Sequence, residues 1–133
     1  METVFVLLGL LAVASCQMKL PPKDMRILLE SNTQCQKLSG ATQQEIMATI
    51  QGNFSDSPAL KDHIFCLGEK LKLISSDGKF DRDFAKSKMM EVIPDEAKID
   101  EILDKCLIHK DNARDSAYES IKCFSDNRDI LMA

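Results

Sequence analysis

Apolar residues recur along the chain with a helical period. After Pro58, for example, they are spaced by alternating steps of four and three, which places them on one face of a helix. Nowhere do apolar and polar residues alternate in the way that a half-buried strand requires. The pattern therefore predicts an all-α fold. The residues of this example are Leu60, Ile64, Leu67, Leu71 and Ile74.

Capping and breaking residues divide the chain into six predicted short helices. Thr42 and Glu45 form a T-x-x-E capping box, and Ser57-Pro58 combines an N-cap with proline at the first helical position. The sequence Asp77-Gly78 breaks the helix that follows. We expect helices at about 22–38, 42–50, 58–74, 81–94, 99–107 and 112–124. In the first of them, Met25, Leu28 and Leu29 should face inward, and the second carries Ile46, Met47 and Ile50.

The N-terminus carries an almost unbroken apolar run from Val4 to Ala14. This run is too short to cross a bilayer, which takes about 20 apolar residues, but it fits the core of a secretory signal peptide. Cleavage could follow Ala14 or Cys16. The later cut leaves an even number of cysteines, as secreted proteins usually have. We therefore expect a signal peptide at 1–16 and a single mature domain at 17–133.

A bacterial lipoprotein signal is the alternative, since Val13 to Cys16 resembles a lipobox. Such signals begin with positive charge, whereas this chain begins Met1-Glu2-Thr3.

The full chain has a net charge of −4, and the predicted signal removes only one acidic residue. A mildly acidic surface argues against nucleic acid and anionic membranes as partners. We expect a secreted, extracellular protein without stable membrane association.

Four cysteines remain in the predicted mature chain, each within a predicted helix: Cys35, Cys66, Cys106 and Cys123. They allow three pairings, among which the spacing does not choose. Structural zinc sites usually contain close pairs such as C-x-x-C, and the chain has none, so we expect disulfides. Because such short helices are marginal alone, each bridge should stabilise the fold by roughly 3–4 kcal/mol.

The segments around these cysteines carry a family resemblance. CQxLSG-x-T begins at Cys35, and KxHxxC, DKC and AYESIKC end at the other three. The chain resembles the insect odorant-binding and pheromone-binding proteins, in particular their four-cysteine "minus-C" branch, which is common in beetles. The resemblance implies the pairs Cys35–Cys66 and Cys106–Cys123, and a central cavity for small apolar ligands such as odorants, pheromones or lipids. It also implies sensillum lymph or haemolymph as the location, and an olfactory receptor as a further partner.

Most of that family has six cysteines. The places of the second and fifth, which bond to each other, are held here by Asp62 and Arg114. These two side chains could form an ion pair or could be unrelated charges facing solvent. A surface ion pair is much weaker than a disulfide, so it would not replace the covalent constraint.

The candidate ligand-binding residues are apolar or aromatic residues at inward positions, rich in adaptable Met and Phe side chains. The same residues could simply form a filled core. Tyr118, the only tyrosine, could anchor a ligand oxygen, or its hydroxyl could reach solvent or a backbone carbonyl. The candidates are Met25, Leu28, Phe54, Leu67, Leu71, Phe84, Met89, Leu103, Tyr118, Ile121 and Phe124.

We expect no catalytic site, metal or cofactor. A calcium loop with Gly78 at its sixth position would put Leu73 at the first ligand position and Phe84 at the twelfth, where a carboxylate is required. His63 and His109 are too few and too scattered for a metal site. The sequence thus predicts a secreted carrier of small apolar molecules that is not an enzyme.

The alternatives are a helical signalling protein and a membrane-active protein of the saposin type, both without a ligand cavity. A saposin-like protein would clamp its termini together with cysteines, whereas a long segment precedes Cys35 here.

Asn53-Phe54-Ser55 forms a glycosylation sequon in a predicted loop.

Overall fold

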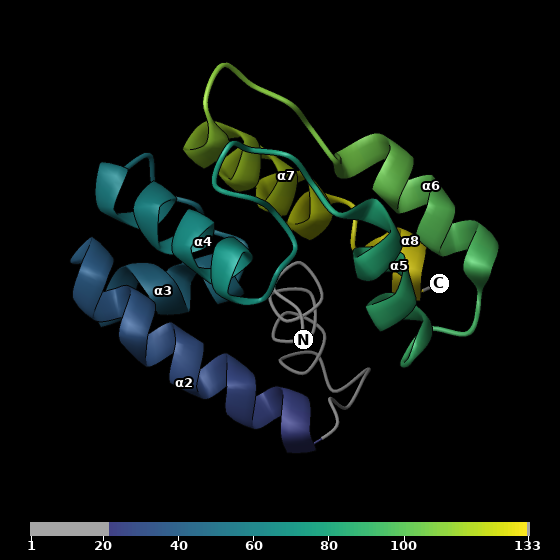
Figure 1. Cartoon of the computed structure of the whole chain (residues 1–133), viewed down its shortest axis with the longest axis horizontal. Helices are drawn as coiled ribbons and strands as arrows, with labels where there is room; N and C mark the ends of the chain where they lie inside the picture. The colour runs from purple at the N-terminus through teal and green to yellow at the C-terminus, as the bar shows by residue number, and fades with distance from the viewer. Residues whose placement is uncertain (1–21, 133) are drawn as a thin grey trace.

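A computed structural model of the chain describes residues 22–132. Within this range the protein forms seven helices, and its only β pairing is an isolated bridge between Ile74 and Phe80. The all-α prediction is confirmed. The helices are α2 (Pro22–Ser39), α3 (Gln43–Ile50), α4 (Pro58–Lys70), α5 (Arg82–Met90), α6 (Glu96–Cys106), α7 (Ala113–Asp126) and α8 (Asp129–Met132) (Figure 1).

The predicted helix starts at α3 and α4 are confirmed. Thr42 Oγ1 accepts a hydrogen bond from the Glu45 amide at 3.0 Å, and Glu45 Oε1 accepts one from the Thr42 amide at 3.1 Å, which completes the capping box. Ser57 Oγ caps α4 by accepting from the Leu60 amide at 3.0 Å. Each cap satisfies amides that a helix start leaves unpaired and contributes about 1 kcal/mol.

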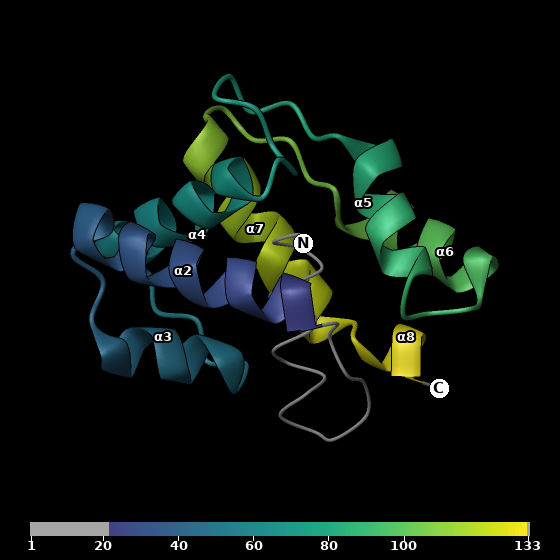
Figure 2. The ribbon, with the colours of Figure 1, turned by 60° about the horizontal axis from the view of Figure 1, so that its bottom comes forward.

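The helices pack in two groups that meet at α7. Helix α4 packs against α2 and α7, while α6 packs against α5, α7 and α8. Both views show α5, α6 and α8 together, to one side of α2, α3 and α4 (Figure 2). Buried apolar side chains from both groups join in a continuous cluster.

The prediction that the third helix reaches Ile74 was wrong, because α4 ends at Lys70. Lys72 has a φ of 63°, a left-handed conformation that turns the chain out of the helix. Leu71, Leu73 and Ile74 are nevertheless buried, since the turn folds them back onto the core. The regular spacing of apolar residues therefore extends beyond the residue at which the helix ends.

Two further expectations differ from the structure. Leu29 is 57% exposed, although its spacing predicts an inward position, and Met47, another apolar residue of a predicted helix, is 46% exposed. Each directly follows a buried residue, Leu28 or Ile46, and consecutive helical side chains point about 100° apart. In addition, α7 continues to Asp126 and the short α8 follows it.

The predicted signal peptide at 1–16 lies outside the described residues. Between residues 22 and 132, no helix is long and apolar enough to cross a membrane.

Candidate functional site

Two disulfides fix the helices around the interior. Cys35 is bonded to Cys66, which joins α2 to α4, and Cys106 is bonded to Cys123, which joins α6 to α7. Of the three pairings that four cysteines allow, the structure has the one that the family resemblance implies. Each disulfide thereby links two helices that pack against each other.

An ion pair joins α4 to α7 at the two positions where the family resemblance implies a third disulfide. Arg114 Nη1 donates to Asp62 Oδ1 at 2.7 Å, and this carboxylate raises the pKa of Arg114. Of the two alternatives for these residues, the structure thus contains the ion pair. The side chains are 59% and 39% exposed, so solvent screens the attraction and leaves the α4–α7 contact without covalent support.

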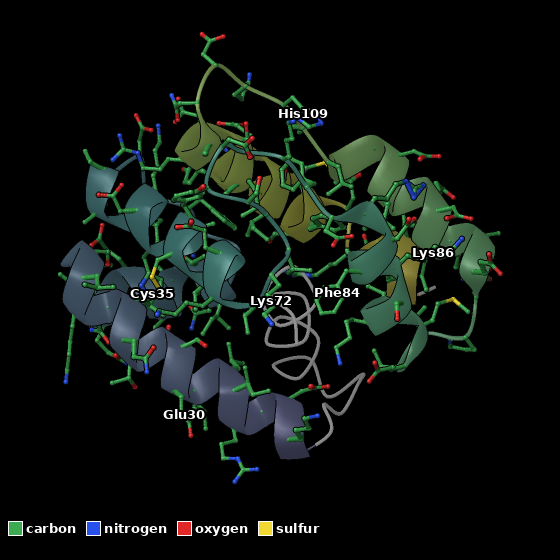
Figure 3. The ribbon with its side chains drawn as sticks, viewed as in Figure 1. Glu30, Cys35, Lys72, Phe84, Lys86 and His109 are labelled. Carbon is green, nitrogen blue, oxygen red and sulfur yellow. A yellow bond between two sulfur atoms is a disulfide. The ribbon has the colours of Figure 1, made fainter. Side chains whose placement is uncertain are left out.

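All eleven candidate ligand-binding residues lie in or against the apolar cluster. Eight are buried core members, while Met25, Phe54 and Phe84 are partly buried and pack against them. Phe84 lies on the inner side of α5 (Figure 3). The structure brings these residues together from α2, the α3–α4 loop, α4, α5, α6 and α7. Their contact with a ligand stays a prediction.

The cluster also contains residues that the candidate list omitted. Ile64, Ile99 and Ile102 could have been included from their helical spacing, since they continue the same apolar faces. Leu73 and Phe80 lie in the α4–α5 connection, and no periodic signal marked them. The omitted members include Leu60, Ile64, Leu73, Ile74, Phe80, Ile93, Ile99, Ile102 and Leu131.

Tyr118 uses its hydroxyl within the protein. The hydroxyl donates to the Ser55 carbonyl oxygen at 2.7 Å, and the ring meets Phe54 edge-on with centroids 5.9 Å apart. Burial raises the pKa of the phenol. Of the alternatives for the Tyr118 hydroxyl, the structure therefore contains the hydrogen bond to a backbone carbonyl. Tyr118 therefore holds the α3–α4 loop against α7 and brings Phe54 to the cluster.

His63 is a buried polar residue between α4 and α2. Its Nε2 lies 2.9 Å from Asn32 Oδ1, and burial lowers its pKa, with partial compensation from the Cys35 backbone. The adjacent enclosed space measures only about 10 Å³, roughly one water molecule. This part of the described interior is closely packed. Its lining consists of Asn32, Ile46, Thr49, Ile50, Leu60, His63, Ile64 and Leu67.

Ion pairs fix α5 to its neighbours. Lys86 lies between α5 and α6, with its Nζ 2.8 Å from Glu96 and 3.0 Å from Asp100 (Figure 3). On another side of α5, Lys88 Nζ lies 3.8 Å from the buried carboxylate of Asp24 in the first turn of α2. The same helix carries Phe84 and Met89, the two α5 candidates, of which Met89 is in the cluster and Phe84 packs against it.

A family model matches residues 17–127, most of the chain, and its description is the PBP/GOBP family. The chain belongs to this family. PBP/GOBP proteins are the insect odorant-binding proteins, a family of binding proteins and carriers rather than enzymes.

Curated members with similar sequences come from insects. The B2 protein of Tenebrio molitor is 29% identical over 104 residues, which cover 78% of this chain and 81% of that protein. The B1 protein of the same species is 28% identical over 76% of this chain and 78% of its own length. Odorant-binding protein 10 of Aedes aegypti is 26% identical over 74% and 71%.

Solved structures share the fold. Odorant Binding Protein 7 from Anopheles gambiae, which has four disulfide bridges and was solved with an azo compound, matches with a TM-score of 0.67 at 23% identity, covering 86% of this chain and 99% of that one. The fatty acid binding protein OBP56a from the blowfly Phormia regina also matches at 0.67, with 22% identity over 85% and 98%. The THP12 carrier protein from yellow meal worm matches at 0.59, with 31% identity over 71% and 87%.

Proposed function

We propose that this PBP/GOBP protein is a secreted carrier that holds a small apolar molecule among the side chains of its interior cluster. The proposal rests above all on the cluster, in which apolar residues from α2, α4, α5, α6 and α7 converge. The chain also belongs to a family of carriers. The THP12 carrier, at 31% identity, supports the same function. The azo compound and fatty acid named for two structural relatives indicate the kind of ligand.

The chain further fits the four-cysteine branch of the family. Two disulfides are present, and Asp62 and Arg114 occupy the places of the missing pair. We assign residues 1–16 to a signal peptide and residues 17–133 to the carrier, released into an extracellular fluid such as sensillum lymph or haemolymph. An olfactory receptor is the macromolecular partner that this role implies.

We expect the ligand to bind with micromolar affinity. Transfer of apolar surface from water contributes roughly 25 cal/mol per Å². The costs of ordering the ligand and the site reduce this to a net of about −8 kcal/mol, which corresponds to micromolar affinity. Ligands of roughly 10–20 heavy atoms satisfy this balance without exceeding the usual free energy per atom.

Displacement of a fluorescent apolar probe from the mature protein tests the proposal. Fatty acids, alcohols, esters and terpenoids should compete with the probe at micromolar concentrations. Phe84→Ala and Met25→Ala remove partly buried side chains that pack against the cluster, and each should weaken binding several-fold. Leu29→Ala, on the same helix as Met25 but 57% exposed, is the matched control and should bind normally.

Failure of the whole panel to displace the probe would contradict the carrier function. It would favour a helical signalling or membrane-active protein with a filled core. Equal losses in Met25→Ala and Leu29→Ala would contradict the assignment of the site, because only the first side chain belongs to the cluster.

A further inference from the structure

The α3–α4 loop contains the sequence Asn53-Phe54-Ser55, which is the only Asn-X-Ser/Thr sequon in the chain. We propose that Asn53 carries an N-linked oligosaccharide. The inference rests on the secretory part of the proposed function, because the modification takes place on chains that enter the secretory pathway. It concerns a surface feature and is independent of the ligand site.

The backbone presents Asn53 at the surface. Gly52 has a φ of 93°, a left-handed conformation suited to glycine, and this residue turns the chain away from the end of α3. The Asn53 amide then donates to the Ala48 carbonyl at 2.8 Å, which fixes the backbone at this point. The Asn53 side chain is exposed. The side-chain nitrogen, Nδ2, is therefore placed where an attached sugar extends into solvent.

The residues after Asn53 divide between the interior and the surface. Phe54 packs on Tyr118 inside, and the Ser55 carbonyl accepts the Tyr118 hydroxyl bond at 2.7 Å. The Ser55 hydroxyl instead faces outward, where it donates to Glu45 Oε2 at 3.2 Å. A sugar on Asn53 thus leaves the inward contacts of its neighbours in place, so the folded protein accommodates the modification.

The order of synthesis gives the sequon access to the transferase. The contact that holds the loop inward comes from Tyr118, 63 residues later in the chain than Ser55. The chain enters the secretory compartment from its N-terminus, so the sequon arrives before α7 has emerged, and the segment is then free to extend. Asn53 Nδ2 then attacks C1 of a lipid pyrophosphate-linked oligosaccharide. The C1–O bond breaks, the lipid pyrophosphate leaves, and Nδ2 loses one proton.

The test is secretion of the full chain from insect cells, followed by mass measurement with and without peptide N-glycosidase. The wild-type protein should lose the mass of one glycan on treatment, and Asn53 should be converted to Asp in its proteolytic peptide. Asn53→Gln and Ser55→Ala should both abolish the loss, whereas Ser55→Thr should retain it, because threonine preserves the sequon. Secreted wild-type protein without any enzyme-sensitive mass overturns the proposal.

Two further measurements separate this proposal from the carrier function. Secreted Asn53→Gln protein should bind the fluorescent probe within about twofold of wild type, since the Asn53 side chain lies outside the cluster. Unglycosylated protein refolded from bacteria should also bind the probe. Absence of binding in both samples would count against the carrier function, while the mass data would still decide the glycan.

Discussion

Two buried polar side chains, His63 and Tyr118, connect parts of the chain that are far apart in sequence. Burying such groups is costly unless they are hydrogen-bonded, and each has a specific partner, Asn32 for His63 and the Ser55 carbonyl for Tyr118. The two hydrogen bonds position segments of the chain relative to each other. His63 aligns α4 with α2 beside a disulfide, and Tyr118 fixes the loop that carries Phe54.

Burial of His63 predicts a pH dependence of stability. Because burial lowers the pKa of His63, the folded protein keeps it neutral, while the unfolded chain binds a proton once the pH falls below about 6.5. This residue's contribution to the free energy of unfolding should therefore fall as the pH drops through about 6.5 toward the folded pKa. Urea unfolding at about pH 7.5 and 5.5 measures the effect.

The matched variants are His63→Gln, which does not titrate and can still donate to Asn32, and His109→Gln, which changes an exposed histidine. The loss of stability on acidification should be smaller in His63→Gln than in wild type, and unaffected in His109→Gln. A loss of the same size in all three proteins would show that His63 is not the group responsible.

At the scale of the helices, local signals in the sequence located starts better than ends. The capping box at Thr42 and the Ser57-Pro58 pair acted through side chains adjacent in sequence, so both could be recognised. The end of α4 is decided by tertiary packing: the left-handed Lys72 returns Ile74 to the core beside Gly68. The spacing of apolar residues predicts that Ile74 is buried. It does not indicate whether the backbone is still helical at that residue.

The α4 turn predicts a specific steric effect at Gly68. A Cβ at this position would lie 2.7 Å from Ile74 Cγ2, well inside contact distance. Gly68→Ala should therefore destabilise the protein by about 1–3 kcal/mol, even though alanine favours helices. In an Ile74→Ala background the same substitution should be neutral or stabilising, because the clashing methyl is absent. Chemical denaturation of the four proteins tests this, and a destabilisation that persists without Ile74 would contradict it.

The contact between α4 and α7 can be strengthened with a disulfide. The Asp62–Arg114 ion pair brings these two side chains together, and we expect Asp62→Cys combined with Arg114→Cys to form a bond in the oxidised protein. The bond should stabilise the fold by roughly 3–4 kcal/mol, raise the melting temperature and slow ligand exchange. Each single cysteine variant is a control. A double variant that stays reduced under oxidising conditions would show that the two backbones are too far apart.

For the whole molecule, the fold class could be predicted from periodicity, and the disulfide pairing from the resemblance carried by the segments around the cysteines. The ligand-lining residues could not be separated from the rest of the core. Leu67, Leu103 and Phe124 are fully buried members of the same cluster as Met25 and Phe84. An inward apolar side chain has the same spacing whether it meets another side chain or a ligand. The difference lies in packing, which one chain's pattern does not encode.

Burial of an apolar molecule in this interior can be measured by calorimetric titration of the mature, disulfide-bonded protein with a medium-chain fatty alcohol at several temperatures. We expect one site, a dissociation constant near the micromolar range, and a binding heat that becomes more favourable as temperature rises. Such a negative heat-capacity change marks apolar surface leaving water. Absence of saturable heat at every temperature, or binding with no heat-capacity change, would show that this interior does not bury an apolar molecule.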